Sequence, residues 1–239
     1  MNYRSLFIAD FNNIRRDPML LMASSAPVII LLLLILGYPA LDVLLQNTFS
    51  ISINAYYGFA CVFMLHLIPM LLGMVYGFIL LDERDEGMIT YFVVTPLGKR
   101  GYLTLRMFAP VLFSFVTILV FVGITNFDDS LIWWKHVPLA LITAFQAPII
   151  LLFLGGFAAN KVEGMAVAKG FGILLMAIPV DYFFSSHWTF FAGISPLFWT
   201  ARGLLAENIV HVISYIAVAF VMHAIFLFLL FSRFKQLEK

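Results

Sequence analysis

The chain contains little charge. Asp, Glu, Lys and Arg together make up 11% of its 239 residues, whereas hydrophobic residues make up 63% and 26 residues are Phe. The mean hydropathy is +1.01. A soluble domain with a single core needs a far more polar surface than this, so the composition excludes that class. It predicts an all-α membrane protein.

Cysteine is almost absent as well. Cys61 is the single cysteine and lies inside a long apolar stretch, which excludes an intramolecular disulfide and a thiolate metal cluster. The sequence also lacks the Gly-x-x-x-x-Gly-Lys-Ser/Thr loop that cradles nucleotide phosphates. A net charge of +1 gives no reason to expect nucleic acid as a partner. We therefore predict that the chain binds no cofactor of its own.

Six long stretches are almost free of charge. A helix that spans the bilayer needs roughly 20 apolar residues. The predicted spans cover residues 19–44, 53–81, 101–126, 136–159, 165–185 and 208–232. They form one membrane domain, 19–232, between an N-terminal interfacial helix (1–18) and a cytoplasmic tail (233–239). Because a charged segment precedes the first span and no small-residue cleavage pattern follows it, a removable signal peptide is not expected.

The positive residues indicate the orientation. Lys and Arg beside the spans stay preferentially in the cytoplasm. With both termini inside, only Lys135 and Arg202 of the 14 Lys and Arg residues fall outside. All four Trp residues then fall on the outer side, at the interface that indoles prefer. We predict a multi-pass plasma-membrane protein with both termini in the cytoplasm.

The first 17 residues show an amphipathic pattern. At 100° per residue, Phe7 and Phe11 share a face, and Arg15 and Arg16 come where a helix on the inner leaflet meets the headgroups. Asp10 interrupts the apolar face. The pattern predicts an amphipathic interfacial helix; the alternative is a disordered basic tail.

The densest charge lies between the second and third spans. Four acids, Asp82, Glu83, Asp85 and Glu86, precede Pro96. We expect these acids at the start of a short helix, where the helix macrodipole favours negative charge. This segment is predicted to be a cytoplasmic coupling helix that contacts another protein; the alternative is a solvated loop without a partner.

The connection before the sixth span is long and aromatic. It runs from Ser185 to Glu207 and is too short for two spans. It predicts short interfacial or re-entrant helices that shape an exit, or an aromatic collar seated in the headgroups.

Several polar residues lie within the spans. Ionisable groups in the bilayer are costly and usually face protein or a wet cavity, so they are candidates for a pathway. The candidates are His66, Tyr76, Gln146 and Asp181. The alternatives are a neutral His that bonds a neighbouring helix, an interfacial Asp, and ordinary packing residues. His223 is weighed in the same way as His66. Because His66, His223 and Asp181 lie on different spans and no pair has the spacing of metal ligands or of an acid–base pair, neither a metal site nor a catalytic site is predicted.

The run from Glu83 to Arg106 resembles the loop between the second and third spans of permease subunits of type-2 ABC exporters, a small six-span class. Three further stretches match that class in the same order. They are Arg15-Arg16-Asp17-Pro18, Asn160-Lys161-Val162-Glu163-Gly164 with Lys169, and Ser195-Pro196 followed by Trp199 to Leu205. The chain departs from the pattern at Met88, where Thr is common, and at Gly98, where Ser often stands.

The resemblance implies a non-catalytic permease subunit of a prokaryotic exporter. Such a subunit moves a hydrophobic or amphiphilic small molecule, drug-like compound, peptide or lipid outward, and a separate cytosolic P-loop ATPase binds ATP and Mg. A second permease copy, identical or paralogous, completes the transporter. The coupling contacts that the resemblance implies are Glu83, Asp85, Glu86, Gly87, Thr90, Thr95 and Pro96. The alternatives are a secondary transporter or channel driven by an ion gradient and, less favoured, an intramembrane enzyme.

Overall fold

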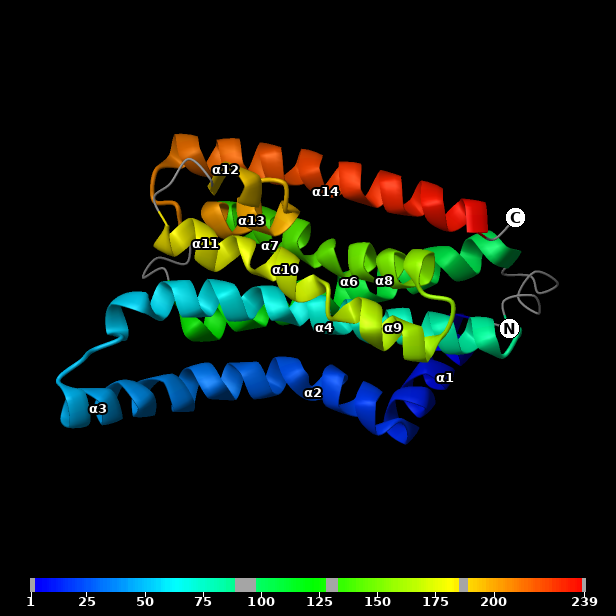
Figure 1. The fold of residues 1–239 in the computed structure, drawn as a ribbon, viewed down its shortest axis with the longest axis horizontal. Coiled ribbons are helices and arrows are strands. Elements are labelled where there is room, and N and C mark those ends of the chain that lie inside the picture. Colours follow the sequence, from blue (N-terminus) through cyan, green and yellow to red (C-terminus); the bar gives the residue numbers. More distant parts are fainter. Residues whose placement is uncertain (1–2, 89–97, 128–132, 185–188, 238–239) are drawn as a thin grey trace.

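The computed structural model describes residues 3–88, 98–127, 133–184 and 189–237, and the secondary structure of this part is entirely helical (Figure 1). Six helical stretches are long and apolar enough to cross a membrane. They are Pro18–Phe49, Asn54–Asp85, Gly101–Thr125, Trp133–Phe157, Lys161–Phe183 and Ile209–Lys235. The prediction of an all-α protein with six spans is confirmed.

The N-terminal helix α1 (Tyr3–Arg16) is inclined to the spans and lies at one end of the bundle (Figure 1). Helix α2 (Pro18–Leu32) begins directly after Asp17. The Asp17 carboxylate caps α2, since Oδ1 accepts hydrogen bonds from the backbone N–H groups of Met19 (2.8 Å) and Leu20 (3.2 Å). Pro18 suits the first helical position because the N–H that it lacks would have no partner there.

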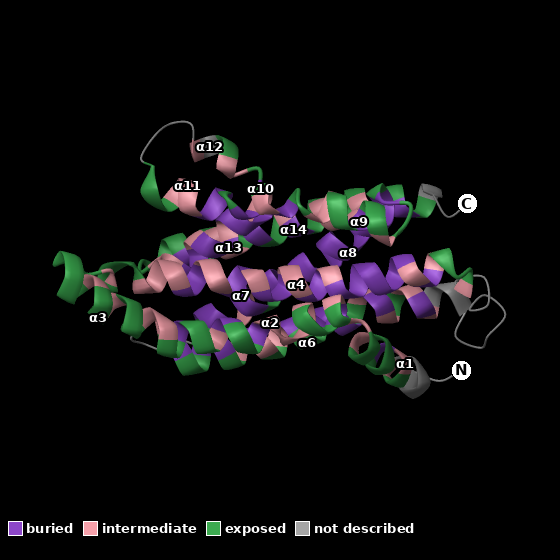
Figure 2. Ribbon diagram, turned by 60° about the horizontal axis from the view of Figure 1, so that its bottom comes forward, coloured by how far each residue is buried: buried purple, intermediate pink, exposed green. Residues whose placement is uncertain are grey.

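The first span is interrupted in its middle. A π-helical turn, η1 (Leu33–Gly37), separates α2 from α3 (Tyr38–Phe49). Pro39 has no N–H to offer to the preceding turn, and the N–H of Tyr38 bonds to the carbonyl of Leu33, five residues back. Only 22% of the 18-residue apolar window of this span is buried, so the span lies at the edge of the bundle (Figure 2).

Helix α4 (Tyr57–Asp85) forms the centre of the bundle, after a short 3₁₀ turn, η2 (Asn54–Tyr56). One face of α4 packs closely along α8 (Gln146–Phe157). A Cβ atom added to Gly73 would lie 2.5 Å from the carbonyl oxygen of Ala147, so the two backbones nearly touch. Helix α6 (Gly98–Thr125), the third span, packs on another side of α4.

The fourth span is the most deeply buried of the six, since 72% of its 18-residue apolar window lies inside the bundle. Its two helices, α7 (Trp133–Ala144) and α8, meet at a break at Phe145. Pro148 has no N–H to donate to the carbonyl of Ala144. Just before it, the N–H of Phe145 bonds to the carbonyl of Ile142, three residues back, at 3.1 Å, in a turn tighter than that of an α-helix. The break therefore frees a backbone carbonyl in the middle of the span.

The fifth span consists of three short helices, α9 (Lys161–Ala168), α10 (Phe171–Leu175) and α11 (Ala177–Phe183). Two more short helices, α12 (Thr189–Ala192) and α13 (Pro196–Leu205), precede the last span, α14 (Ile209–Leu237). Helix α13 packs against α4, α7 and α14 and buries most of its side chains. Its burial inside the protein favours the re-entrant interpretation over the headgroup collar.

The two chain ends lie at the same end of the bundle (Figure 1). We call this the termini end; it holds α1, the last turn of α4, the start of α9 and the last turns of α14. Helices α3, α11 and α12 lie at the opposite end (Figure 1).

Candidate functional site

The last turn of α4 contacts three other helices through consecutive side chains. Asp82 accepts an ion-paired hydrogen bond from Lys161 at the start of α9, at 2.7 Å. Glu83 pairs with Arg106 of α6. Arg84 donates to two backbone carbonyls at the end of α8, the nearer at 2.7 Å. Successive side chains on a helix point about 100° apart, which lets three neighbours reach three different helices. We call Asp82, Glu83 and Arg84 the α4 anchor.

The predicted position of the acids is wrong. Residues 82–85 belong to the last turn of α4 rather than to the start of a short helix, and Gly87, with a φ of 69°, follows the end of α4. The macrodipole disfavours acids at a helix C-terminus, so it does not explain them. Instead, direct ion pairs compensate the negative charges: Lys161 pairs with Asp82, and Arg106 pairs with Glu83.

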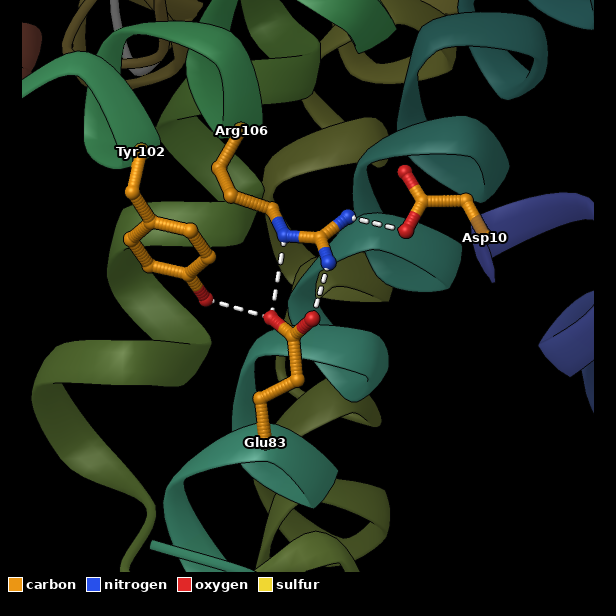
Figure 3. A network of polar contacts seen from close by, with 4 residues as sticks. All are labelled: Asp10, Glu83, Tyr102 and Arg106. Atoms are coloured by element: carbon orange, nitrogen blue, oxygen red, sulfur yellow. Dashed lines mark hydrogen bonds and ion pairs between the residues drawn. The ribbon is translucent and has the colours of Figure 1, made fainter. Parts of the chain in front are cut away.

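A buried ionic cluster joins α1, α4 and α6 (Figure 3). Arg106 contacts both oxygens of Glu83 with its guanidinium, through Nε at 3.0 Å and through Nη2, and its Nη1 lies 2.6 Å from Asp10 Oδ1. The hydroxyl of Tyr102 donates to Glu83 Oε2. The Arg106 side chain is 2% exposed, and both carboxylates are nearly as deeply buried. A planar guanidinium presents its donors in a rigid fork, so Arg106 holds the two carboxylates in fixed directions.

The cluster explains the acid that interrupts the apolar face of α1. Asp10 points inward, where its carboxylate binds Arg106, while Phe11 beside it is exposed. Burial raises the pKa of Asp10 above its ordinary value, and the nearby Arg106 opposes that shift. The chain thus fixes α1 to the third span with an ion pair as well as with apolar contacts such as Phe7 on Phe113.

A second ionic contact lies nearer to solvent. Lys161 Nζ is 2.6 Å from Asp17 Oδ2 and 2.7 Å from Asp82, so it connects the starts of α2 and α9 with the end of α4. The hydrogen bond from Lys161, together with those from the first N–H groups of α2, lowers the pKa of Asp17. Partly exposed pairs of this kind add little to stability, so this contact sets the position of the helices more than their stability.

Beyond the α4 anchor the chain becomes accessible. Asp85, Glu86 and Gly87 are exposed, and so are Arg15 and Arg16 of α1. A cleft of about 520 Å³ separates the start of α2 from this tip, and its lining includes both acidic and basic groups. The charged residues of the lining are Arg16, Asp17, Asp82, Glu83 and Glu86.

The predicted coupling residues therefore divide into groups. Asp85, Glu86 and Gly87 are exposed at the tip, whereas Glu83 is 5% exposed and bonds within the chain through both of its oxygens. Thr90, Thr95 and Pro96 lie outside the residues that the structure describes. The contact of Glu83 with a partner stays a prediction, and its burial gives it an internal role.

Comparison with known proteins identifies the family. A family model described as "Fluoroquinolones export permease protein Rv2686c-like" matches residues 10–231. The chain belongs to this Rv2686c-like family of export permeases. The resemblance to permease subunits of type-2 ABC exporters is thereby confirmed, and membership of this class implies an ATPase partner.

Two curated relatives come from Mycobacterium tuberculosis. They are the fluoroquinolones export permease proteins Rv2686c of strain H37Rv and MT2760 of strain CDC 1551 / Oshkosh. Each is 25% identical to this permease over 204 residues, which cover 83% of this chain and 81% of the relative. No solved structure matches it.

The permease also buries polar side chains deep in its spans. His66 lies 2.9 Å from the Thr200 hydroxyl of α13 through Nε2, and 2.7 Å from the carbonyl of Val62 through Nδ1. The carbonyl can only accept, so Nδ1 carries a proton. In the neutral ring Nε2 then accepts from the Thr200 hydroxyl, whose alternative acceptor is the carbonyl of Leu197 at 3.0 Å. Gln146, at the break of the fourth span, reaches the same hydroxyl at a long 3.5 Å. This geometry favours a neutral His that joins two helices.

The other pathway candidates lie elsewhere. Asp181 pairs with Arg202 through both oxygens, at 2.8 and 2.6 Å, and links α11 to α13. Tyr76 lines a groove beside α1. His223 is buried with its Nε2 unbonded, as is Oε1 of Gln146. Among the described residues, no three His, Cys, Asp or Glu side chains form a group able to hold a metal ion.

Four functional contacts were missed by sequence reasoning, although some left a signal. Arg106 and Tyr102 fall within the stretch that resembles the exporter loop, and Asp10 interrupts the apolar face of α1. A buried acid on an amphipathic helix requires a partner, and this requirement alone points toward a cation nearby. Thr200 left no such signal, since a single hydroxyl in an apolar segment is ordinary.

Proposed function

We propose that the chain is the transmembrane subunit of an ATP-driven exporter and that the tip of α4 couples it to the ATPase. The observation that carries this proposal is the arrangement at the termini end. Asp85, Glu86 and Gly87 are exposed, and the residues directly before them are fixed to α6, α8 and α9. A force applied to the tip would therefore move several spans together.

The charge distribution supports a cytoplasmic termini end. Arg15, Arg16, Arg84 and Lys161 lie there with the basic end of α14, whereas Lys135 and Arg202 lie toward the other end. Positive residues beside spans stay preferentially in the cytoplasm, where an ATPase is found. The partner would supply the P-loop and bind ATP and Mg. A second permease copy would complete a transporter with two ATPase subunits.

The cargo that we propose is a hydrophobic or amphiphilic, drug-like small molecule moved outward across a prokaryotic plasma membrane. The curated relatives are named for export of fluoroquinolones, which are compounds of this kind. The apolar interior with isolated polar groups suits such cargo.

The test uses the double variant Asp85→Lys/Glu86→Lys, which reverses the exposed acids without touching the α4 anchor. We expect a P-loop ATPase to copurify with the wild-type chain in mild detergent but not with this variant. We also expect the variant to lose ATP-dependent efflux. The control is Glu207→Lys, an exposed acid between α13 and α14. Unchanged copurification and efflux in the double variant would contradict the proposal.

A secondary transporter stays the second candidate, because His66, Thr200 and Gln146 form a buried polar contact where an ion-coupled transporter would need one. Proteoliposomes that contain the permease alone separate the two functions. Uptake driven by an imposed proton or sodium gradient without any ATPase would support this candidate; uptake that requires the ATPase and ATP would exclude it.

A further inference from the structure

A groove opens on the side of the bundle near the termini end. Four helices form it, and its volume is about 460 Å³, within the range of small-molecule sites. Its lining residues include Phe7 and Phe11 of α1, Val28 of α2, Tyr76 of α4 and Phe113 of α6. Phe11, Val28 and Phe113 are 65%, 62% and 47% exposed, so the mouth of the groove faces the surroundings of the bundle.

The floor of this groove is polar. Asp10 and Tyr76 both line it, and each is 4% exposed. Asp10 uses Oδ1 for Arg106, and its other oxygen carries no dashed line in Figure 3. The Tyr76 hydroxyl makes no hydrogen bond to another described group. Two polar atoms with free bonding capacity thus meet apolar walls, which is the composition of a ligand site rather than of a lipid-facing seam.

The charge at the floor is unbalanced. Arg106 is the one cation of the cluster, and it faces two carboxylates, Asp10 and Glu83. Among the described side chains the cluster, with both carboxylates ionised, therefore carries one net negative charge. Electrostatic attraction is stronger in such a buried place than in water, so the groove favours a cation. The rings of Phe7, Phe11 and Phe113 add surfaces that attract cations and pack on apolar groups.

The depth of the groove fits the boundary between headgroups and acyl chains. Tyr76 lies seven residues before Glu83 on α4, which places it about 10 Å further from the termini end at 1.5 Å per residue. An amphiphile that lies at this boundary holds its charged group near the headgroups and its apolar body in the acyl region.

We propose that the groove between α1, α2, α4 and α6 binds a cationic amphiphile from the leaflet at the termini end. Its ammonium group lies beside Asp10 and the Tyr76 hydroxyl, and its aromatic or alkyl body lies along Phe7, Phe11 and Phe113. The groove is the site at which cargo leaves the leaflet; this role, though not the binding, rests on the proposed function.

The test compares two fluorescent probes that differ in one charge. Dansylcadaverine has an aromatic body and a primary amine, and its N-acetyl derivative is neutral. Binding is measured by fluorescence anisotropy with the full chain in phosphatidylcholine nanodiscs, and the signal of empty nanodiscs is subtracted. We expect the amine to bind about tenfold more tightly than the amide, since only the amine gains the buried charge interaction.

Three variants locate the site. Val28→Trp fills the mouth and leaves the ionic cluster intact, and we expect it to weaken binding of both probes by about tenfold or more. Tyr76→Phe removes one hydroxyl, and Asp10→Asn removes the charge, so each should reduce the preference for the amine. The control is Val43→Trp, an exposed residue of α3 at the opposite end. Thermal melting of each variant shows whether it folds. If Asp10→Asn does not fold, the binding measurement on Val28→Trp decides the outcome.

Equal affinity for amine and amide would overturn the cationic specificity. Equal probe binding by Val28→Trp and Val43→Trp would overturn the site itself. Complete loss of probe binding when phosphatidylethanolamine is added to the nanodisc would also overturn it, because the groove would then be a lipid site. No ATPase is present in these measurements. Binding that succeeds while ATP-dependent efflux fails would therefore overturn the proposed function and leave the site.

Discussion

Arg106 is the residue on which the termini end depends most. It is nearly inaccessible and bonds to the carboxylates of Asp10 and Glu83, which come from two other helices. Buried carboxylates remain tolerable only while a cation compensates them, because their hydration has been removed. The cluster thereby makes the position of α1 depend on the third span, because directed ion pairs fix its position more narrowly than apolar contacts alone would.

Replacement of this residue should therefore be costly. We expect Arg106→Ala to lower the free energy of unfolding by about 3–5 kcal/mol, because it leaves two buried carboxylates without a cation. Thermal unfolding of the purified chain in nanodiscs measures the loss. The matched control is Arg15→Ala on the exposed face of α1. A stability of Arg106→Ala equal to that of the control would show that the cluster is hydrated rather than buried.

A double variant gives a second check on the same contact. Glu83→Gln in the Arg106→Ala background removes one of the stranded charges. We expect it to restore part of the lost stability, since the two changes share one interaction and are not additive. A further loss of stability in the double variant would indicate that Glu83 has another cationic partner.

At the scale of the helices, close approach of α4 and α8 forms the core. Gly73 has no room for a side chain, since its Cβ would lie 2.5 Å from the carbonyl oxygen and 2.9 Å from the Cα of Ala147. Both atoms belong to the backbone, so neither can turn away as a flexible side chain would.

We expect Gly73→Ala to destabilise the chain by about 1–3 kcal/mol, because the added methyl group forces α4 and α8 apart. Gly123→Ala is the matched control, because a Cβ there meets nothing within 4 Å. That change should be neutral or stabilise by about 0.5–1 kcal/mol, the usual gain of Ala over Gly inside a helix. Thermal melting of the two variants side by side measures the difference. Equal melting temperatures would mean that the two helices are not in close contact.

The spans themselves could be predicted from the sequence, because hydropathy over roughly 20 residues reports directly on the bilayer. The breaks inside them could not. Pro27, Pro69, Pro110 and Pro138 lie within continuous helices, whereas the chain breaks at Phe145, near Pro148. Whether a proline ends a helix depends on what else can bond the freed carbonyl, and that is a tertiary property.

The site could be predicted only in part, for a similar reason. The charge density after the second span indicated the tip of α4, and Asp85 and Glu86 are indeed exposed there. The sequence could not indicate which acid of the run faces inward, because the helix was expected to end earlier than Asp85. Extending α4 by one turn directs Glu83 to Arg106 and leaves its neighbours in solvent.

At the scale of the whole molecule, burial is uneven among the spans. Within the 18-residue apolar window of each span, 72% is buried in the fourth and 50% in the second, whereas 22% is buried in the first and 17% in the last. Helices α4, α7 and α8 therefore form the rigid centre, and the outer spans expose apolar faces that lipid or a second permease copy would cover. Under the proposed function, a movement at the termini end would reach this centre through the α4 anchor, and it would reach the first and fifth spans through Lys161.

This arrangement separates coupling from stability, and Lys161→Met tests the separation. The side chain is 23% exposed and its two ion pairs are partly solvated, so its loss should change the free energy of unfolding by less than about 1 kcal/mol. The first and fifth spans, which also pack on α4, would then follow its end less closely. We expect ATP hydrolysis by the assembled exporter to continue while efflux falls several-fold, which lowers the number of cargo molecules moved per ATP.

The control is Lys169→Met, which changes an exposed residue of the same span and should leave the number of cargo molecules moved per ATP unchanged. The ratio is measured in proteoliposomes from phosphate release and cargo flux together; an unaltered ratio in Lys161→Met would mean that the movement passes through Glu83 and Arg84 alone.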